Sequence, residues 1–282
     1  MGIKRADLIG SWYPGTEREC RKMIEEFLEK ISVPDEDYLG IGGIVPHAGW
    51  FFSGKTATAV YSAIKHAVTI ELVFLFGMHL PPGSENYIFV DEGYETPFGP
   101  VYVNGEATGM MLDSFSFVEE DAVNYVRDNT IEIQLPFIKY FFPEATVVAC
   151  GISPGPSAIE IGKKASEISK SLEYNTCFIG STDLTHYGPN YGFVSHGTGI
   201  EALKWVKEVN DKRIVELFLE INPKAIMEEA ELHHNACCPG AVAAATSAVS
   251  ESGAKKGILV DYSTSYDVMP NSSFVGYAGV VY

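Results

Sequence analysis

Short apolar runs alternate with amphipathic segments along most of the chain, and this alternation constrains the fold more than any other feature. The runs that are short enough to be buried strands lie at 41–50, 71–79, 146–152 and 176–183, with two further runs at 256–263 and 272–282. The segments with helical spacing lie at 16–31, 54–66, 130–141, 156–172, within 197–230, and at 238–250. This order is typical of an α/β protein with a mainly parallel or mixed central sheet flanked by helices.

The chain shows no repeat, no low-complexity tract and no linker, so we expect a single domain over residues 1–282. The Pro- and Gly-rich stretch 81–103 is expected to be loop with short extended pieces. The five cysteines are odd in number and two of them are adjacent, which favours reduced thiols over a disulfide framework.

The charge balance limits the kinds of molecule that this protein is expected to bind. Lysine and arginine total 20 against 37 acidic residues, which gives a net charge of −17 at pH 7. Such a surface repels phosphate backbones and attracts metal cations, so a nucleic-acid partner is not expected. No apolar run reaches the roughly 18 residues of a membrane helix, so no membrane association is expected. The first residues lack the apolar core of a signal peptide, which indicates a cytoplasmic protein.

Three histidines follow three of the predicted strands. His47 comes after the run 41–45, His79 after 72–76, and His186 after 177–180. In open α/β sheets, ligands bind outside the carboxyl ends of the strands, so these imidazoles are expected to converge on one site. Asp183 precedes His186 by three residues and either orients that imidazole or caps a turn.

Two adjacent cysteines, Cys237 and Cys238, stand where a helix is expected to begin. A helix N-terminus favours the thiolate, which binds metals or attacks electrophiles. Neighbouring side chains on a helix point about 100° apart, so we expect only one of the two to serve the site. The alternative is that both are small buried hydrophobic residues. For His233 and His234, just upstream, a structural role is favoured over a place in the site.

At these residues the chain resembles the Memo family over nearly its whole length. The resemblance rests on the order and spacing of motifs at 10–14 (GSWYP), 45–49 (VPHAG), 76–79 (FGMH), 181–188 (STDLTHYG), 236–237 (AC), 262–265 (YSTS) and 275–277 (VGY). It implies a fold like that of the class III extradiol dioxygenases, which use non-haem Fe(II). It also implies metal ligation by His47, His79 and Cys237, with His186 near the metal.

The chain also departs from the pattern of the resembling proteins at several positions. Cys237 stands where the dioxygenases have a carboxylate, and a thiolate is softer, which raises affinity for copper or oxidised iron. The segment 128–132 lacks a histidine that the family commonly has, Cys238 replaces a common glycine, and Phe52 replaces a common tyrosine. No arginine cluster replaces the missing hydroxyl, which disfavours anionic ligands.

Three functions remain open at this point. The first is a metal-dependent oxidoreductase that holds Fe(II), or else Cu or Zn, with His186, aided by Asp183, as general acid and base. The second is a non-catalytic module that binds a peptide or sequesters metal. A third is a Cys237 nucleophile with His186 as base. The ligand is expected to be a small molecule or a peptide, and the residues expected to line its cleft are Trp12, Tyr13 and Trp50.

Overall fold

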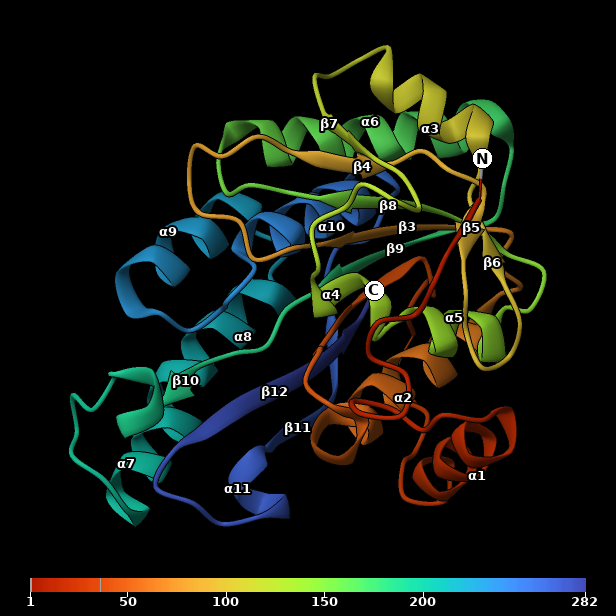
Figure 1. The fold of residues 1–282 in the computed structure, drawn as a ribbon. Coiled ribbons are helices and arrows are strands. Elements are labelled where there is room, and N and C mark those ends of the chain that lie inside the picture. Colours follow the sequence, from red (N-terminus) through yellow and green to blue (C-terminus); the bar gives the residue numbers. More distant parts are fainter. Residues whose placement is uncertain (1, 36) are drawn as a thin grey trace.

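The computed structural model describes residues 2–35 and 37–282, so Met1 and Glu36 of the expected domain lie outside the described residues. Its centre is a mixed sheet in the order β10-β12-β2-β9-β3-β8-β4-β7, with β11 also paired to β12 (Figure 1). These strands are β2 (Gly42–Val45), β3 (Leu72–Gly77), β4 (Tyr87–Phe89), β7 (Val118–Glu120), β8 (Thr146–Gly151), β9 (Thr176–Ser181), β10 (His186–Tyr187), β11 (Ile258–Thr264) and β12 (Phe274–Val281). A small second sheet contains β1 (Ile3–Lys4), β5 (Gly93–Tyr94) and β6 (Val101–Tyr102).

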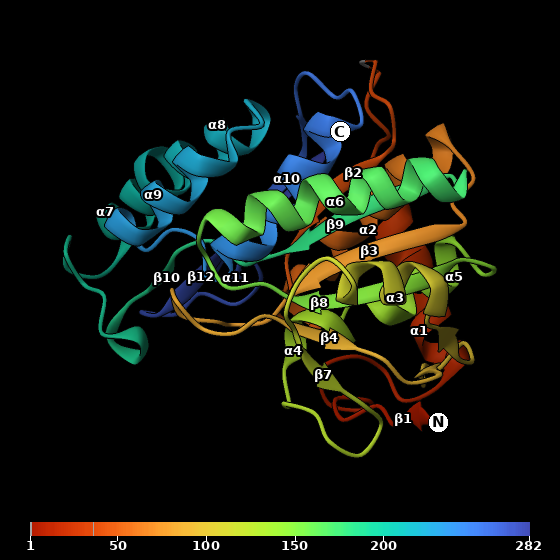
Figure 2. The same ribbon diagram turned by 90° about the horizontal axis from the view of Figure 1, so that it is seen from above.

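Helices cover both faces of the sheet, as Figures 1 and 2 show. They are α1 (Glu17–Leu28), α2 (Trp50–Ala67), α3 (Gly105–Leu112), α4 (Asn129–Glu132), α5 (Leu135–Phe141), α6 (Pro156–Leu172), α7 (Ile200–Trp205), α8 (Asp211–Leu219), α9 (Pro223–His233), α10 (Pro239–Glu251) and α11 (Ser265–Val268). No helix in the described part of the chain is long and apolar enough to cross a membrane. The α/β class with a mixed, helix-flanked sheet is therefore confirmed.

The apolar runs form strands because both of their faces are buried. On β3, Leu72, Phe74 and Phe76 face one core, which α6 and α10 complete. Val73 and Leu75 face the opposite core, which α2 and α5 complete. Successive side chains of a strand point to opposite faces, so a strand buried on both sides is one continuous apolar run in the sequence.

Several element boundaries differ from the prediction. The helix expected at 54–66 begins at Trp50, so this tryptophan lies in the first turn of α2. The helix expected over 130–141 divides into α4 and α5, with Pro136 in the first turn of α5. Pro136 has no N–H to donate to the carbonyl of Glu132 four residues before it, which explains the break. The helix α3 and the strand β7 were not predicted.

The four central strands β2, β9, β3 and β8 run parallel, so their carboxyl ends lie at one edge of the sheet. In register, Val45 pairs with Ser181, and Phe76 pairs with Gly180. The turns that follow these residues therefore start side by side, which brings three distant segments of the chain together.

Close packing of α6 on α10 generates a stability prediction. A Cβ atom at Gly162 would meet the carbonyl oxygen of Ala244 on α10, whereas a Cβ at Gly109 on α3 would meet no neighbouring atom. Gly162→Ala should therefore lower the free energy of unfolding by about 1–3 kcal/mol through overpacking. Gly109→Ala should raise it by about 0.5–1 kcal/mol, because alanine restricts the unfolded chain. Urea denaturation measures both, and equal effects of the two changes would contradict this account of the packing.

Candidate metal centre

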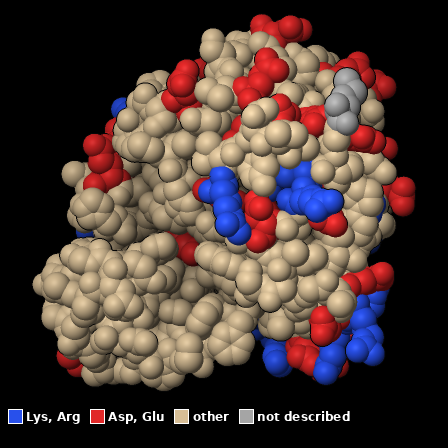
Figure 3. Space-filling model, in the orientation of Figure 1, with Lys and Arg blue, Asp and Glu red and all other residues tan. Residues whose placement is uncertain are grey.

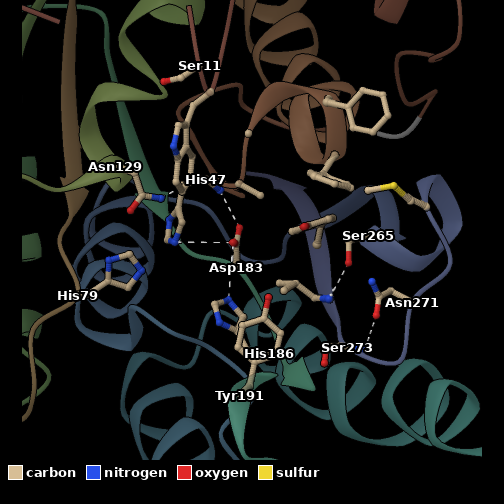
Figure 4. A pocket seen from close by; sticks show the side chains of 18 residues that line it. Ser11, His47, His79, Asn129, Asp183, His186, Tyr191, Ser265, Asn271 and Ser273 are labelled. Atoms are coloured by element: carbon tan, nitrogen blue, oxygen red, sulfur yellow. Dashed lines mark hydrogen bonds and ion pairs between the residues drawn. The ribbon is translucent and has the colours of Figure 1, made fainter. Parts of the chain in front are cut away.

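Three polar turns extend from neighbouring strands and face one another (Figure 4). His47 follows the end of β2 by two residues, Asp183 follows the end of β9 by two, and His79 follows the end of β3 by two. Strand β9 lies between β2 and β3 in the sheet, so Asp183 starts between the two histidines. The three turns therefore meet at the carboxyl edge of the sheet, as the sequence predicts.

His47 is held by hydrogen bonds on both its ring and its backbone, and it is only 1% exposed. Its Nδ1 lies 3.1 Å from the hydroxyl of Ser181, which itself donates to the carbonyl of Thr130 at 2.7 Å. The hydroxyl therefore accepts from Nδ1–H of His47, and Nε2 faces Sγ of Cys237 at 3.2 Å. The His47 backbone N–H donates to the Asp183 carboxylate at 2.8 Å.

His79 is oriented by the carboxylate of Asp128, which is also a helix cap. Asp128 does cap α4 by accepting from Thr130 N–H, and its other oxygen lies 3.0 Å from Nδ1 of His79. The chain turns through a left-handed conformation at Met78, with φ of 70°, before it reaches His79. The His79 ring then stands nearly perpendicular to that of His47, with centroids 4.9 Å apart. The Asp128–His79 pair joins residues far apart in sequence, so no local pattern marks it.

Cys237 is fixed by reciprocal bonds with the turn after β9. Its N–H donates to the carbonyl of Asp183 at 3.2 Å, and its sulfur accepts from the N–H of Asp183 at 3.3 Å. The helical spacing assumed for the two cysteines is wrong, because both precede α10. That only one of them serves the site stays a prediction. Their sulfurs lie 3.8 Å apart. The ligand atoms of His47, His79, Cys237 and Cys238 all lie within 4.8 Å of one another.

Asp183 and His186 lie beside this cluster. Oδ2 of Asp183 is 3.8 Å from Nε2 of His186 and 3.9 Å from Nε2 of His47, so the carboxylate stands between two imidazoles (Figure 4). Nε2 of His186 is buried and has no hydrogen-bond partner among the described residues. A buried polar atom without a partner costs free energy, so it fits a site that is completed by a ligand.

The charges of the imidazoles follow from their neighbours. Burial lowers the pKa of His79, but the Asp128 carboxylate and the Cys237 thiolate outweigh it and raise this pKa to about 10. Burial also lowers the pKa of His186, but the Asp183 carboxylate and the Cys237 thiolate outweigh it and raise this pKa to about 10. Both imidazole rings are therefore protonated and positively charged at neutral pH unless another cation displaces the added proton.

The thiolate of Cys237 supplies the negative charge beside these protonated imidazoles. Burial raises the pKa of Cys237, yet a hydrogen bond from Cys238 and the charges of His47 and His186 bring it well below its usual range. A thiolate and two imidazoles with anchored Nδ1 atoms are donors that transition metals prefer. The residues present thus fit a metal ion, which would displace the imidazole protons.

A cavity of about 630 Å³ opens on the cluster. Of the three aromatic residues expected to line it, only Trp12 does so. Tyr13 is 3% exposed and donates its hydroxyl to Glu132, and Trp50 is 1% exposed and stacks on Phe137. Both belong to the core, because α2 begins early enough to turn Trp50 inward. The cavity wall instead includes residues that were not predicted, among them Phe51, Asn129, Tyr191, Ser265, Asn271 and Ser273.

A buried carboxylate behind the site explains two motifs whose role the sequence did not reveal. Asp211 is wholly buried and accepts from the N–H and the hydroxyl of Thr185 and from the hydroxyl of Tyr262 at 2.8 Å. Gly276 packs against the same carboxylate, where a Cβ atom would collide with it. Asp211, Tyr262 and Gly276 therefore hold Thr185, and with it the turn that carries His186.

The histidines upstream of the cysteines divide between two environments. Nε2 of His233 lies 2.7 Å from the guanidinium of Arg213, outside the cluster. His234 ends α9 in a left-handed conformation and lines a second cavity together with Cys237.

Comparison with known proteins agrees with the sequence motifs. The family described as Memo-like protein matches residues 4–281. A MEMO1 family protein of Nitrosopumilus maritimus is 32% identical over 288 residues, which cover 99% of this chain and 98% of that protein. A MEMO1 family protein of Thermococcus onnurineus is 29% identical over 99% of both chains. An uncharacterized protein of Escherichia coli K12 aligns with a TM-score of 0.47 and 10% identity over 84% of this chain and 98% of that one.

The Asp128–His79 pair generates a testable prediction. Asp128→Asn should lower the pKa of His79 from about 10 toward the ordinary value near 6.5, because the carboxylate charge is lost. Metal affinity should fall about 10- to 100-fold, as expected for a partner that orients a metal-binding histidine. Proton NMR of the imidazole against pH measures the first effect. Asp113→Asn, at an exposed position after α3, is the matched control, and an unshifted His79 in Asp128→Asn would refute the pairing.

Proposed function

The chain belongs to the Memo family, and on that premise we propose that it is a metal-dependent oxidoreductase whose ion is held by His47, His79 and Cys237. The observation that supports this most is the convergence of two imidazole nitrogens and one sulfur within 4.8 Å, at the ends of adjacent strands. Two histidines and one anionic ligand leave coordination positions free, which is the arrangement of catalytic rather than structural sites.

Fe(II) is the first expectation for the ion, on the strength of the likeness to the dioxygenases, and copper or zinc are the alternatives. The sulfur of Cys237 is a softer donor than the carboxylate it replaces, which favours copper more than an all-nitrogen and oxygen site would. A bound iron or copper ion would supply one-electron redox chemistry at this position.

His186 and Asp183 are proposed to handle protons beside the ion. Nε2 of His186 is buried and free of hydrogen bonds to other described residues, and the Asp183 carboxylate lies 3.8 Å from it. The carboxylate stabilises the protonated ring, so His186 can hold a proton for a ligand in the cavity and take it back. This assigns to Asp183 the role of positioning and to His186 that of acid and base.

A peptide-binding module is the second candidate, and exposed side chains in the cavity wall favour it. Phe51, Tyr191 and Met269 are each about half exposed or more, so an aromatic or peptide ligand could cover them. The lobe around α7 and α11 shows few charged side chains beside a hollow in the surface (Figure 3). Among the described residues that line the cavity there is no lysine or arginine.

The ligand assignment gives a direct prediction. His47→Ala, His79→Ala and Cys237→Ala should each lower Fe(II) or copper affinity by roughly 100-fold or more, since each removes a ligand rather than a partner of one. His186→Ala should keep stoichiometric metal and lose any turnover, because His186 is assigned to protons and not to the ion. Anaerobic titration followed by elemental analysis measures the bound metal.

Three outcomes separate the interpretations of the site. Unchanged isotherms for the three ligand variants would sink the metal assignment, and loss of metal from a folded His186→Ala protein would make His186 a ligand. If Cys237 is instead a nucleophile, metal should not protect it, whereas a ligand thiolate should resist alkylation once metal is added.

The charge of the cavity gives a prediction for the peptide-binding hypothesis. A phosphotyrosine carries close to two negative charges at neutral pH, and this cavity wall has no lysine or arginine to pair with them. The protonated rings of His79 and His186 supply positive charge locally, but the net charge of −17 opposes the approach of an anion. We expect phosphopeptide affinity no better than ~100 μM, or about −5.5 kcal/mol. Calorimetry with phosphorylated and unphosphorylated peptides at two salt concentrations is the test. Low-micromolar binding that depends on the phosphate would favour the binding module over the enzyme.

A further inference from the structure

The second cysteine of the pair lies where a ligand would lie. We propose that Cys238 supplies a second thiolate to the centre, so that the ion is held by two histidines and two cysteines. Such a set suits a thiophilic ion, Cu(I) or Zn(II), more than Fe(II). The inference rests on the proposed ligand set of His47, His79 and Cys237, to which Cys238 adds a fourth ligand. A fourth ligand fills a coordination position that the three-ligand set leaves open, so it favours the metal-sequestering alternative over the oxidoreductase.

The distances match the edges of a four-ligand tetrahedron. Two sulfurs bound to one zinc at about 2.3 Å are about 3.8 Å apart in tetrahedral geometry, and an imidazole nitrogen and a sulfur are about 3.6 Å apart. The sulfurs of Cys237 and Cys238 are 3.8 Å apart, and Nε2 of His47 is 3.2 Å from the sulfur of Cys237. All four ligand atoms fall within 4.8 Å of one another. Ligand atoms that lie as far apart as 4.8 Å would have to draw together by about 1 Å to complete the set.

The backbone explains how adjacent cysteines come to share one site. Cys238 stands just outside α10, with φ of −128° and ψ of 60°, and Pro239 begins the helix. Its N–H donates to the hydroxyl of Thr182 at 3.1 Å, while the N–H of Cys237 donates to the carbonyl of Asp183 at 3.2 Å. The turn after β9 therefore holds both residues, and their sulfurs face the same way.

Core packing alone does not account for this placement. Cys238 is 2% exposed and is one of the buried residues of the apolar cluster between the sheet and α10, where a small apolar side chain would fill the same space. Packing does not require its sulfur to lie beside another sulfur and two imidazoles.

A cobalt-substituted protein tests the number of sulfur ligands without any assay of turnover. Co(II) takes tetrahedral zinc sites, and its near-ultraviolet band from sulfur to cobalt grows with the number of Co–S bonds. The full-length reduced protein is titrated with Co(II) without oxygen, alongside Cys238→Ser and Cys20→Ser. Cys20 is the matched control, because it is wholly buried away from the centre and its thiol donates to the carbonyl of Pro14, a bond that serine can keep.

The expected result is one Co(II) per chain in all three proteins, with the band at about half intensity in Cys238→Ser alone, since one of two sulfurs is lost. An undiminished band in Cys238→Ser would overturn the inference and leave the three-ligand centre standing. Failure of the unaltered protein to bind Co(II) would overturn the centre itself and the inference with it. If Cys238→Ser binds no cobalt or does not fold, X-ray absorption of the unaltered cobalt protein decides: two sulfur neighbours support the proposal and one overturns it.

Discussion

The contacts of Asp183 are the interaction on which the rest of the centre depends. Its carboxylate accepts the backbone N–H of His47 and lies just under 4 Å from the rings of both His47 and His186. Its own N–H and carbonyl pair with the sulfur and the N–H of Cys237. One residue thus joins the turns after β2 and β9 to the start of α10. These contacts of Asp183 fix the positions of the buried imidazoles and the thiolate relative to one another.

Thr130 plays the corresponding part on the side of His79. Its hydroxyl accepts the N–H of Met78 at 2.6 Å and donates to Asp128 at 2.5 Å, and its carbonyl accepts the hydroxyl of Ser181. A left-handed conformation at a residue such as methionine is unfavourable by itself and persists where its surroundings fix it. The bond from Met78 to Thr130 is such a constraint. It places His79 against His47 at the cost of local strain, as is common at functional sites.

Much of this arrangement could be predicted because it follows from local pattern and from one topological rule. Continuous apolar runs indicated the central strands, since a strand buried on both faces must be apolar at every position. The position of His47 and His79 just after such runs then placed them at one edge of the sheet. The side of the sheet on which a residue packs depends on tertiary contacts, and for this reason Trp50 was expected in the cavity and lies in the core.

The missed features share one physical cause, which is that they depend on backbone conformation or on contacts distant in sequence. Asp128 meets His79 across 49 residues, and Asp211 meets Thr185 across 26. Cys238 faces the centre because α10 begins only at Pro239, so neither cysteine lies within the helix. Sequence spacing alone assumed a regular helix there, and the assumption separated two sulfurs that the structure brings together.

The most direct test is anomalous diffraction from crystals of the untagged protein, purified and crystallised without oxygen, with data collected at the iron, copper and zinc absorption edges. The account predicts one anomalous peak within bonding distance of Nε2 of His47, Nε2 of His79 and the sulfur of Cys237. The edge at which the peak appears identifies the ion. A fully reduced, well-ordered site with no peak at any edge after loading with all three metals, or a peak that lacks these three ligands, would contradict it.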